Sequence, residues 1–133
     1  MTWQPPKLED LRDRRLRYVR ISVTDRCQFR CPYSRPEQGD APCEPQADYL
    51  TPAEIARVVN VLTTIGIRTV RFTGGEPLLR RDLASIIQAV HAVGIDDMAI
   101  TTNAALLTPK RAQNLADAGL RRINISLDTL DPQ

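Results

Sequence analysis

The fold is decided by TPAEIARVVNVLTTIGIRTVRF, residues 51–72, which contains one helix and the strand that follows it. Thr51–Glu54 predicts a helix start, because a threonine N-cap, a proline at the first helical position and a glutamate at the third form a capping box. Apolar residues then recur at helical spacing until Gly66, and the run at 67–72 is typical of a strand. The stretch therefore predicts one helix followed by one strand.

The same helix-strand unit occurs twice more downstream. Each predicted helix ends at a glycine and is followed by a short apolar strand. The further predicted elements are strands at 18–23, 98–101 and 123–127 and helices at about 81–93 and from Thr108–Pro109 to Gly119. Strands that alternate with single helices pair in parallel through right-handed crossovers. The fold class is therefore α/β, and we expect the N-terminal half of a partial (β/α) TIM-type barrel.

The predicted strand at 123–127 is apolar, and the chain stops soon after it, at Gln133. An apolar strand at a sheet edge presents open backbone groups unless something covers it. We therefore expect half a barrel that is completed by a complementing chain, by a second copy in a homodimer, or by a missing C-terminal half. This interpretation divides the chain into an N-terminal extension at 1–16 and a truncated core domain at 17–133.

Composition and charge narrow the class of protein. The chain has 133 residues, of which 42% are hydrophobic and 26% charged, as in an ordinary globular domain. Its formal net charge of +2 is too small to indicate a nucleic-acid partner, and no apolar run is long enough for a membrane span. Residues 1–20 lack the apolar stretch of a secretory signal. Three cysteines, an odd number, argue against a disulfide framework, so we expect a cytoplasmic protein.

A cysteine motif follows the first predicted strand. Cys27 and Cys31 stand in the run CQFRCPYS, where Ser34 takes the place of a third cysteine. Three closely spaced thiolates can hold three irons of a 4Fe–4S cluster and leave the fourth iron open to a substrate. A serine hydroxyl is a harder and poorer donor for iron. Cys43 is an alternative third ligand, and a zinc site made by the cysteines with His91 or water is a further alternative.

A second motif, TGGEP at 73–77, directly follows the strand predicted at 67–72. Its paired glycines let backbone groups approach a ligand closely, so that these groups and the Glu76 carboxylate could bind an ammonium group. The alternative is a tight strand-to-helix turn in which the glycines serve only geometry. The cysteine motif favours the ligand interpretation, because chemistry in parallel α/β folds collects at the carboxyl ends of the strands.

Together the motifs resemble the N-terminal half of radical S-adenosylmethionine enzymes and, more narrowly, the GTP 3',8-cyclase family of lyases in molybdenum cofactor biosynthesis. The resemblance runs from about Leu11 to the last residue. The phrases that carry it are YVRISVTDRC at 18–27, RFTGGEPLLRRD at 71–82, TTN at 101–103 and RINISLDTLD at 122–131. In that family a 5'-deoxyadenosyl radical, made from S-adenosylmethionine at a 4Fe–4S cluster, starts the conversion of GTP to a cyclic pyranopterin precursor.

The resemblance also implies roles for individual residues. It implies Cys27 and Cys31 as cluster ligands, with Ser34 at the third ligand position. It implies S-adenosylmethionine contacts at Tyr33, Gly75 and Ser126 and GTP contacts at Arg20, Arg71 and Thr102. Arginine suits this substrate, because its planar guanidinium group binds phosphate and guanine through paired hydrogen bonds.

The chain departs from the family pattern at three points. Ser34 replaces a cluster cysteine. The family's second three-cysteine cluster and its Gly-Gly tail lie in the C-terminal half, which has no counterpart in this chain. Ala104 stands where the family usually has glycine. We therefore expect little or no turnover by this chain alone. One alternative is a non-catalytic nucleotide or S-adenosylmethionine binding module, or a partner of a full-length enzyme. Another is a non-functional, poorly soluble product with an open sheet edge.

Overall fold

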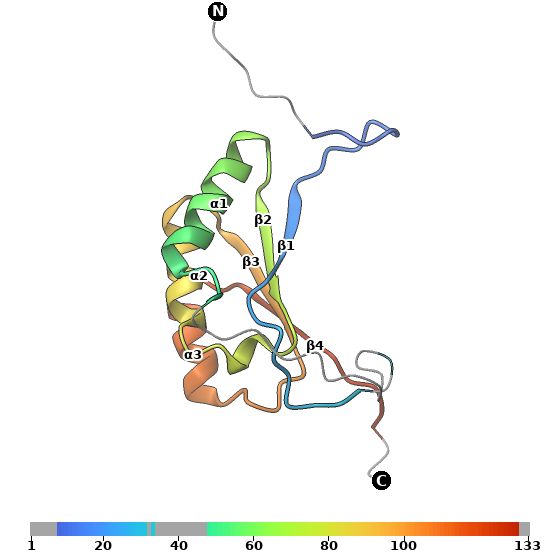
Figure 1. The fold of residues 1–133 in the computed structure, drawn as a ribbon, viewed down its shortest axis with the longest axis vertical. Coiled ribbons are helices and arrows are strands. Elements are labelled where there is room, and N and C mark those ends of the chain that lie inside the picture. Colours follow the sequence, from blue (N-terminus) through green and yellow to red (C-terminus); the bar gives the residue numbers. More distant parts are fainter. Residues whose placement is uncertain (1–7, 32, 34–47, 131–133) are drawn as a thin grey trace, which may run out of the picture.

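The computed structural model describes residues 8–31, 33 and 48–130, and these form a four-stranded parallel sheet with helices on one side (Figure 1). The strands lie in the order β1-β2-β3-β4, so each strand pairs with the next one along the chain. The elements are β1 (Tyr18–Ser22), α1 (Pro52–Thr64), β2 (Thr69–Thr73), the 3-10 helix η2 (Pro77–Leu79), α2 (Leu83–Ala92), β3 (Asp97–Thr102), α3 (Pro109–Asp117) and β4 (Arg122–Ile125). The predicted α/β class and the alternation of strands and helices are confirmed.

The capping box at the start of α1 is present as predicted. The Thr51 hydroxyl accepts a hydrogen bond from the Glu54 backbone N–H at 3.3 Å, and the Glu54 carboxylate accepts one from the Thr51 backbone N–H at 2.8 Å. Two N–H groups that have no partner within the helix are thereby satisfied. On the predicted apolar face, Ile55 and Val59 are buried, whereas Val58 is 47% exposed.

Helices α1, α2 and α3 form one layer against one face of the sheet (Figure 1). Val70 and Phe72 of β2 and Met98 and Ile100 of β3 are fully buried in the core beneath these helices. Because successive side chains of a strand point to opposite faces, Arg71 lies on the other face. We call this other face, which no helix of the described residues covers, the open face.

Strand register places a row of residues across the open face. Arg20 of β1 pairs with Arg71 of β2, Arg71 pairs with Ala99 of β3, and Ala99 pairs with Arg122 of β4. Three of the four strands therefore contribute a guanidinium group at the same level of the sheet.

Strand β4, at one edge of the sheet, is exposed along its whole length. The apolar side chains of Ile125 and Leu127 are 59% and 66% exposed. Across the described ranges, no helix combines the length and the apolar character that crossing a bilayer requires.

Candidate functional site

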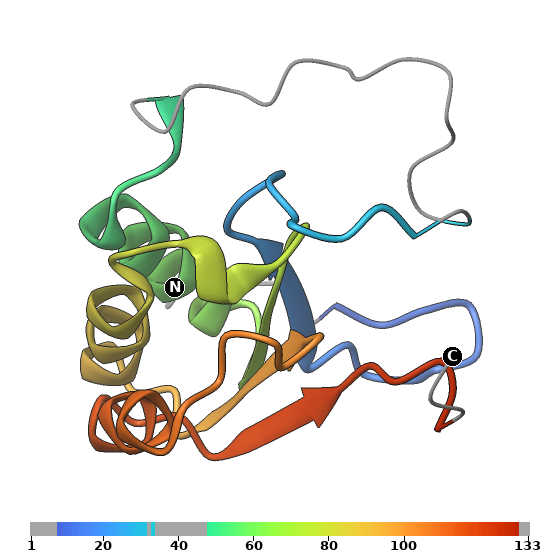
Figure 2. The same cartoon turned by 90° about the horizontal axis from the view of Figure 1, so that it is seen from below.

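The segments that follow the four strands meet around a cavity of about 220 Å³ at the carboxyl ends of the sheet. We call it the strand-end cavity. Figure 2 views the sheet from this end and shows the loops after β1, β2 and β3 side by side. The segments after all four strands contribute residues to the walls of the strand-end cavity, among them Cys27, Cys31, Tyr33, Gly75, Thr101, Thr102 and Ser126. The location agrees with the expectation that unusual loops of a parallel sheet collect at one edge.

Most of the predicted site residues line this cavity. The two cysteines and the predicted S-adenosylmethionine contacts are among them, as is Thr102. Arg20 and Arg71 lie instead on the neighbouring part of the open face, in register with each other. Ser34 and Cys43 lie outside the described residues. The structure thus brings together residues that are up to 99 positions apart in the sequence, since Cys27 and Ser126 share one cavity.

The glycines of the TGGEP loop pack against the first part of the cysteine loop. The Gly75 N–H donates to the Thr24 carbonyl at 2.8 Å, and the Glu76 N–H donates to the Arg26 carbonyl at 2.7 Å. A Cβ atom on Gly74 would collide with the Thr24 carbonyl, and one on Gly75 would collide with the Arg26 carbonyl. The glycines are therefore required for the close approach of two backbone segments of this chain, in addition to any approach to a ligand.

Glu76 is buried and is used by the protein itself. The residue is 1% exposed, and its carboxylate accepts hydrogen bonds from the Leu78 N–H at 2.9 Å, the Thr102 hydroxyl at 2.6 Å and the Asn103 N–H at 2.8 Å. Buried carboxylates are tolerated when several donors replace water in this way. The carboxylate joins the loops after β2 and β3, which is a structural role that the ammonium-binding hypothesis did not include.

Cys27 and Cys31 are half-buried and lie on the wall of the same cavity. Thiolates are suitable donors for iron, but 4Fe–4S clusters are usually held by three or four of them. Among the described residues no group of three or more cysteine, histidine, aspartate or glutamate side chains could hold a metal ion. The described donor set is thus too small for a complete cluster site.

His91 is not part of the cavity. It lies in the last turn of α2, before β3 begins, and its Nδ1 is 3.3 Å from the Ile95 carbonyl oxygen. Since the cysteines lie beyond the opposite ends of the strands, the described structure does not support the zinc site with His91.

Tyr33 connects the cysteine loop to the segment that follows β4. Its hydroxyl donates to the Asp128 carboxylate at 2.6 Å. Hydrogen bonding to Asp128, and secondarily to Cys31, raises the pKa of Tyr33 above its ordinary value of 10. Because Tyr33 also lines the strand-end cavity, the contact links one wall of the cavity to the segment after β4.

The open face beside the cavity carries cationic and unpartnered polar groups. The Arg71 guanidinium lies 5.3 Å from the centre of the Tyr18 ring, and Arg122 donates to Asp97 at 2.5 Å. In the part of the chain that the structure describes, two buried side-chain atoms have no hydrogen-bond partner, Arg71 Nε and Thr101 Oγ1. Thr101 was missed from the sequence, although the two-residue period of a strand, which puts it on the face opposite Met98 and Ile100, could have identified it.

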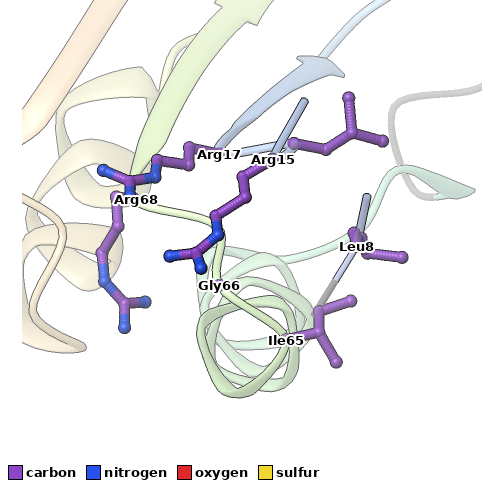
Figure 3. A pocket seen from close by; sticks show the side chains of 7 residues that line it. Leu8, Arg15, Arg17, Ile65, Gly66 and Arg68 are labelled. Carbon is purple, nitrogen blue, oxygen red and sulfur yellow. The ribbon is translucent and has the colours of Figure 1, made fainter. Parts of the chain in front are cut away.

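A second cavity, of about 260 Å³, lies at the other end of the sheet, between the segment before β1 and the end of α1. Its arginine side chains spread apart (Figure 3). Two of them are already engaged, because Arg15 donates to Glu9 at 3.2 Å and Arg68 donates to the Thr63 carbonyl at 2.9 Å. We therefore assign it no chemistry.

Comparisons with known proteins agree with this geometry. Residues 21–133 match the family model of the Radical SAM superfamily. The chain is 45% identical over 129 residues to a GTP 3',8-cyclase of Staphylococcus carnosus (strain TM300), and 46% identical over 124 residues to one of Pelotomaculum thermopropionicum. These alignments cover 94% and 92% of the chain, which spans only 38% of the length of each relative.

Solved structures with the same fold include Streptococcus suis SuiB bound to S-adenosylmethionine, with a TM-score of 0.63 and 24% identity. That comparison covers 86% of this chain and 24% of SuiB. BtrN in an open conformation has a TM-score of 0.61 and 21% identity over 85% of this chain and 50% of its own. At these identities the two structures show a shared partial-barrel fold.

Proposed function

The chain belongs to the Radical SAM superfamily, and from this premise we propose that its strand-end cavity and open face are the S-adenosylmethionine and GTP sites of a GTP 3',8-cyclase. That activity belongs to molybdenum cofactor biosynthesis. The observation that carries the proposal is the convergence of Cys27, Gly75 and Ser126, from three separate segments, on one cavity. The identity of about 45% to cyclases across nearly the whole chain supports it.

The residues divide into two groups by position. In the cavity, Tyr33, Gly75 and Ser126 would bind S-adenosylmethionine beside the two cysteines. On the open face, Arg20 and Arg71 would bind GTP, because paired guanidinium groups match phosphate oxygens in charge and shape. Thr102, the third GTP contact in the proposal, lines the cavity.

We propose that this chain alone has little radical turnover. The family's cluster supplies the electron that generates the 5'-deoxyadenosyl radical, and the described residues offer only two thiolates for it. Ser34 occupies the third position in the sequence, and a hydroxyl is a poor ligand for an iron-sulfur cluster. We therefore assign no reaction step to the cluster.

A non-catalytic module that binds S-adenosylmethionine or a nucleotide, alone or as the partner of a full-length enzyme, is the second candidate. The small thiolate set favours it, since nucleotide binding through arginines and backbone groups requires no iron. Both candidates imply a cytoplasmic location, and the use of cysteines in a candidate metal-binding motif, not in a disulfide framework, supports it.

The test is anaerobic reconstitution with iron and sulfide of the wild-type chain and of Ser34→Cys. Bound iron is quantified, and the binding of S-adenosylmethionine and GTP is measured by calorimetry. The cyclase-type proposal expects more iron in Ser34→Cys than in the wild type and an electron paramagnetic resonance signal that changes with S-adenosylmethionine. The control is Ser34→Cys combined with Cys27→Ser, which removes one thiolate again.

Ligand binding without any gain of iron would favour the binding module. A chain that binds neither S-adenosylmethionine nor GTP, with or without iron, would overturn both candidates.

A further inference from the structure

We propose that Tyr49 is a positioning residue for S-adenosylmethionine binding, because its hydroxyl holds residues 24–26 in the arrangement that supports the strand-end cavity. Residues 24–26 open the loop that carries Cys27 and Cys31, and we call them the loop base. The inference rests on the proposed function and deepens it, since it names a residue outside the cavity on which the affinity for this ligand depends. Neither the sequence motifs nor the family resemblance gave Tyr49 a role.

The Tyr49 hydroxyl connects the side chains of the loop base. It donates to the Asp25 carboxylate and accepts from the Thr24 hydroxyl, the latter at 3.2 Å. The Thr24 hydroxyl in turn accepts from the Arg26 N–H at 3.2 Å. One side chain from the far end of the cysteine loop therefore joins a series of hydrogen bonds that includes all three residues of the loop base.

The loop base supports two walls of the strand-end cavity. Its Thr24 and Arg26 carbonyls accept from the Gly75 N–H at 2.8 Å and the Glu76 N–H at 2.7 Å. Gly75 and Glu76 line the cavity, and so does Cys27, the residue directly after the loop base. The residues of the loop base are not themselves lining residues. They therefore influence a ligand through the segments that they hold.

Tyr49 is itself held in place by Arg80. The guanidinium group lies 5.6 Å from the centre of the Tyr49 ring, and Arg80 is only 5% exposed. A cation at this distance from an aromatic ring is attracted to it. The same guanidinium donates to the carbonyls of Leu50, next to Tyr49, and of Val23, next to Thr24. The hydroxyl thus acts on the loop base from a ring that is fixed.

Removal of the Tyr49 hydroxyl would take away the acceptor of a buried donor. Thr24 is 4% exposed, so water cannot readily replace that acceptor. A Thr24 hydroxyl that turns toward another acceptor releases the Arg26 N–H, which now donates to it. The loop base then leaves its arrangement in part of the molecules, and the apparent affinity for a ligand falls with the fraction that keeps the arrangement.

The experiment compares Tyr49→Phe with Tyr18→Phe. Each variant removes only a hydroxyl from a ring beside an arginine, since the Tyr18 ring centre lies 5.3 Å from the Arg71 guanidinium. Tyr18 is 42% exposed, so water can replace the contacts of its hydroxyl. Binding of S-adenosylmethionine and of GTP is measured separately by calorimetry, and amide hydrogen exchange is measured without ligand.

We expect Tyr49→Phe to weaken S-adenosylmethionine binding about 3- to 10-fold, which corresponds to the loss of one hydrogen bond from the binding arrangement. Its affinity for GTP should be unchanged, because the proposed contacts Arg20 and Arg71 lie on the open face. Exchange should accelerate at the Gly75 and Glu76 amides, which donate to the loop base. Tyr18→Phe should keep the wild-type S-adenosylmethionine affinity and exchange pattern.

Thr24→Val and Thr24→Ser test the same hydrogen bonds from the other side. Valine has the shape of threonine without its hydroxyl and should reproduce the effect of Tyr49→Phe, whereas serine keeps the hydroxyl and should keep the wild-type affinity. The double variant Tyr49→Phe/Thr24→Val should lose no more affinity than either single variant, because both changes interrupt one series of hydrogen bonds.

Wild-type affinity of Tyr49→Phe for S-adenosylmethionine would overturn the inference and leave the proposed function standing. An equal loss of affinity for GTP, or faster exchange throughout the sheet, would also overturn it, because Tyr49 would then support the whole fold and not this site. A wild-type chain that binds neither ligand would overturn the proposed function and, with it, a role of Tyr49 in ligand binding.

Discussion

Glu76 Oε1 and Thr102 Oγ1 are 2.6 Å apart, and this hydrogen bond joins the loop after β2 to the end of β3. The same carboxylate also holds the Leu78 and Asn103 N–H groups, so both of its oxygens are used. Hydrogen bonds to a buried charged group are stronger than neutral ones, because the surrounding protein screens them little. The two loops therefore form one unit on which the strand-end cavity is built.

Glu76→Gln should destabilise the fold. A glutamine amide has one oxygen and one NH₂ group. At least one of the groups that donate to the Glu76 carboxylate would therefore face the NH₂ group, which is itself a donor. We expect a loss of about 1–3 kcal/mol in the free energy of unfolding, measured by urea denaturation. Glu54→Gln on the exposed start of α1 is the control and should cost less, because water can replace its contacts. An unchanged unfolding midpoint for Glu76→Gln would contradict the buried network.

Gly75→Ala should separate the TGGEP loop from the cysteine loop, because the added methyl group would collide with the Arg26 carbonyl oxygen. Gly66→Ala is the matched control. Gly66 has φ +105° and open space around it, so alanine there causes backbone strain of about 1 kcal/mol and no collision. Hydrogen exchange should therefore accelerate at the Gly75 and Glu76 amides only in Gly75→Ala. Equal exchange patterns in the two variants would count against loop packing as the reason for Gly75.

Arg80 should be needed to hold both ends of the cysteine loop. Its guanidinium group is buried and donates to the Val23 carbonyl at 2.8 Å and the Leu50 carbonyl at 2.5 Å. Arg80→Leu leaves these carbonyls unpaired, so we expect a loss of about 1.5–3 kcal/mol and faster amide exchange after β1. Arg81→Leu changes the adjacent, exposed arginine and should have little effect. Similar losses in both variants would show that the buried contacts are not the cause.

Ala104→Gly should stabilise the protein. Ala104 has φ +61°, a left-handed conformation that is unfavourable for residues with a Cβ atom. Glycine removes that strain but gives the unfolded chain more freedom, so the expected net gain is roughly 0.5–1 kcal/mol. The measurement is the midpoint of thermal unfolding. Ala105→Gly, at the next position, is the control and should not raise the midpoint. A lower midpoint for Ala104→Gly than for the wild type would contradict backbone strain at Ala104.

Tyr33 should titrate at higher pH than an ordinary tyrosine. The Asp128 carboxylate accepts a hydrogen bond from the neutral phenol and thus raises the pKa of Tyr33 above 10. The bond is therefore present below pH 10 and is lost only as the pH rises through the raised pKa. The phenolate absorbance of the wild type minus that of Tyr33→Phe measures this titration. Asp128→Asn should lower the pKa of Tyr33 toward 10, and an unchanged pKa in this variant would exclude Asp128 as the cause.

Local patterns in the sequence were sufficient for much of the fold. The spacing of apolar residues, the Thr51 cap and the glycine stops predicted three helices and four strands, and the structure places them within a few residues of the predicted limits. These signals are local, because helix and strand periods are properties of neighbouring residues. The same reasoning placed the cysteine and TGGEP motifs at one edge of the sheet, and both line the strand-end cavity.

The partners of the polar side chains depended on the tertiary structure. From the sequence, Glu76 was a candidate ligand for an ammonium group and Thr102 was the threonine of interest, but packing joins these two residues across 26 positions and leaves Thr101 facing the open face. A hydrogen bond depends on angles and on distances of a few tenths of an ångström, which local periodicity does not specify. The sequence by itself therefore determined which segments meet, and only the packing of β2 against β3 decided which polar atoms have hydrogen-bond partners there and which do not.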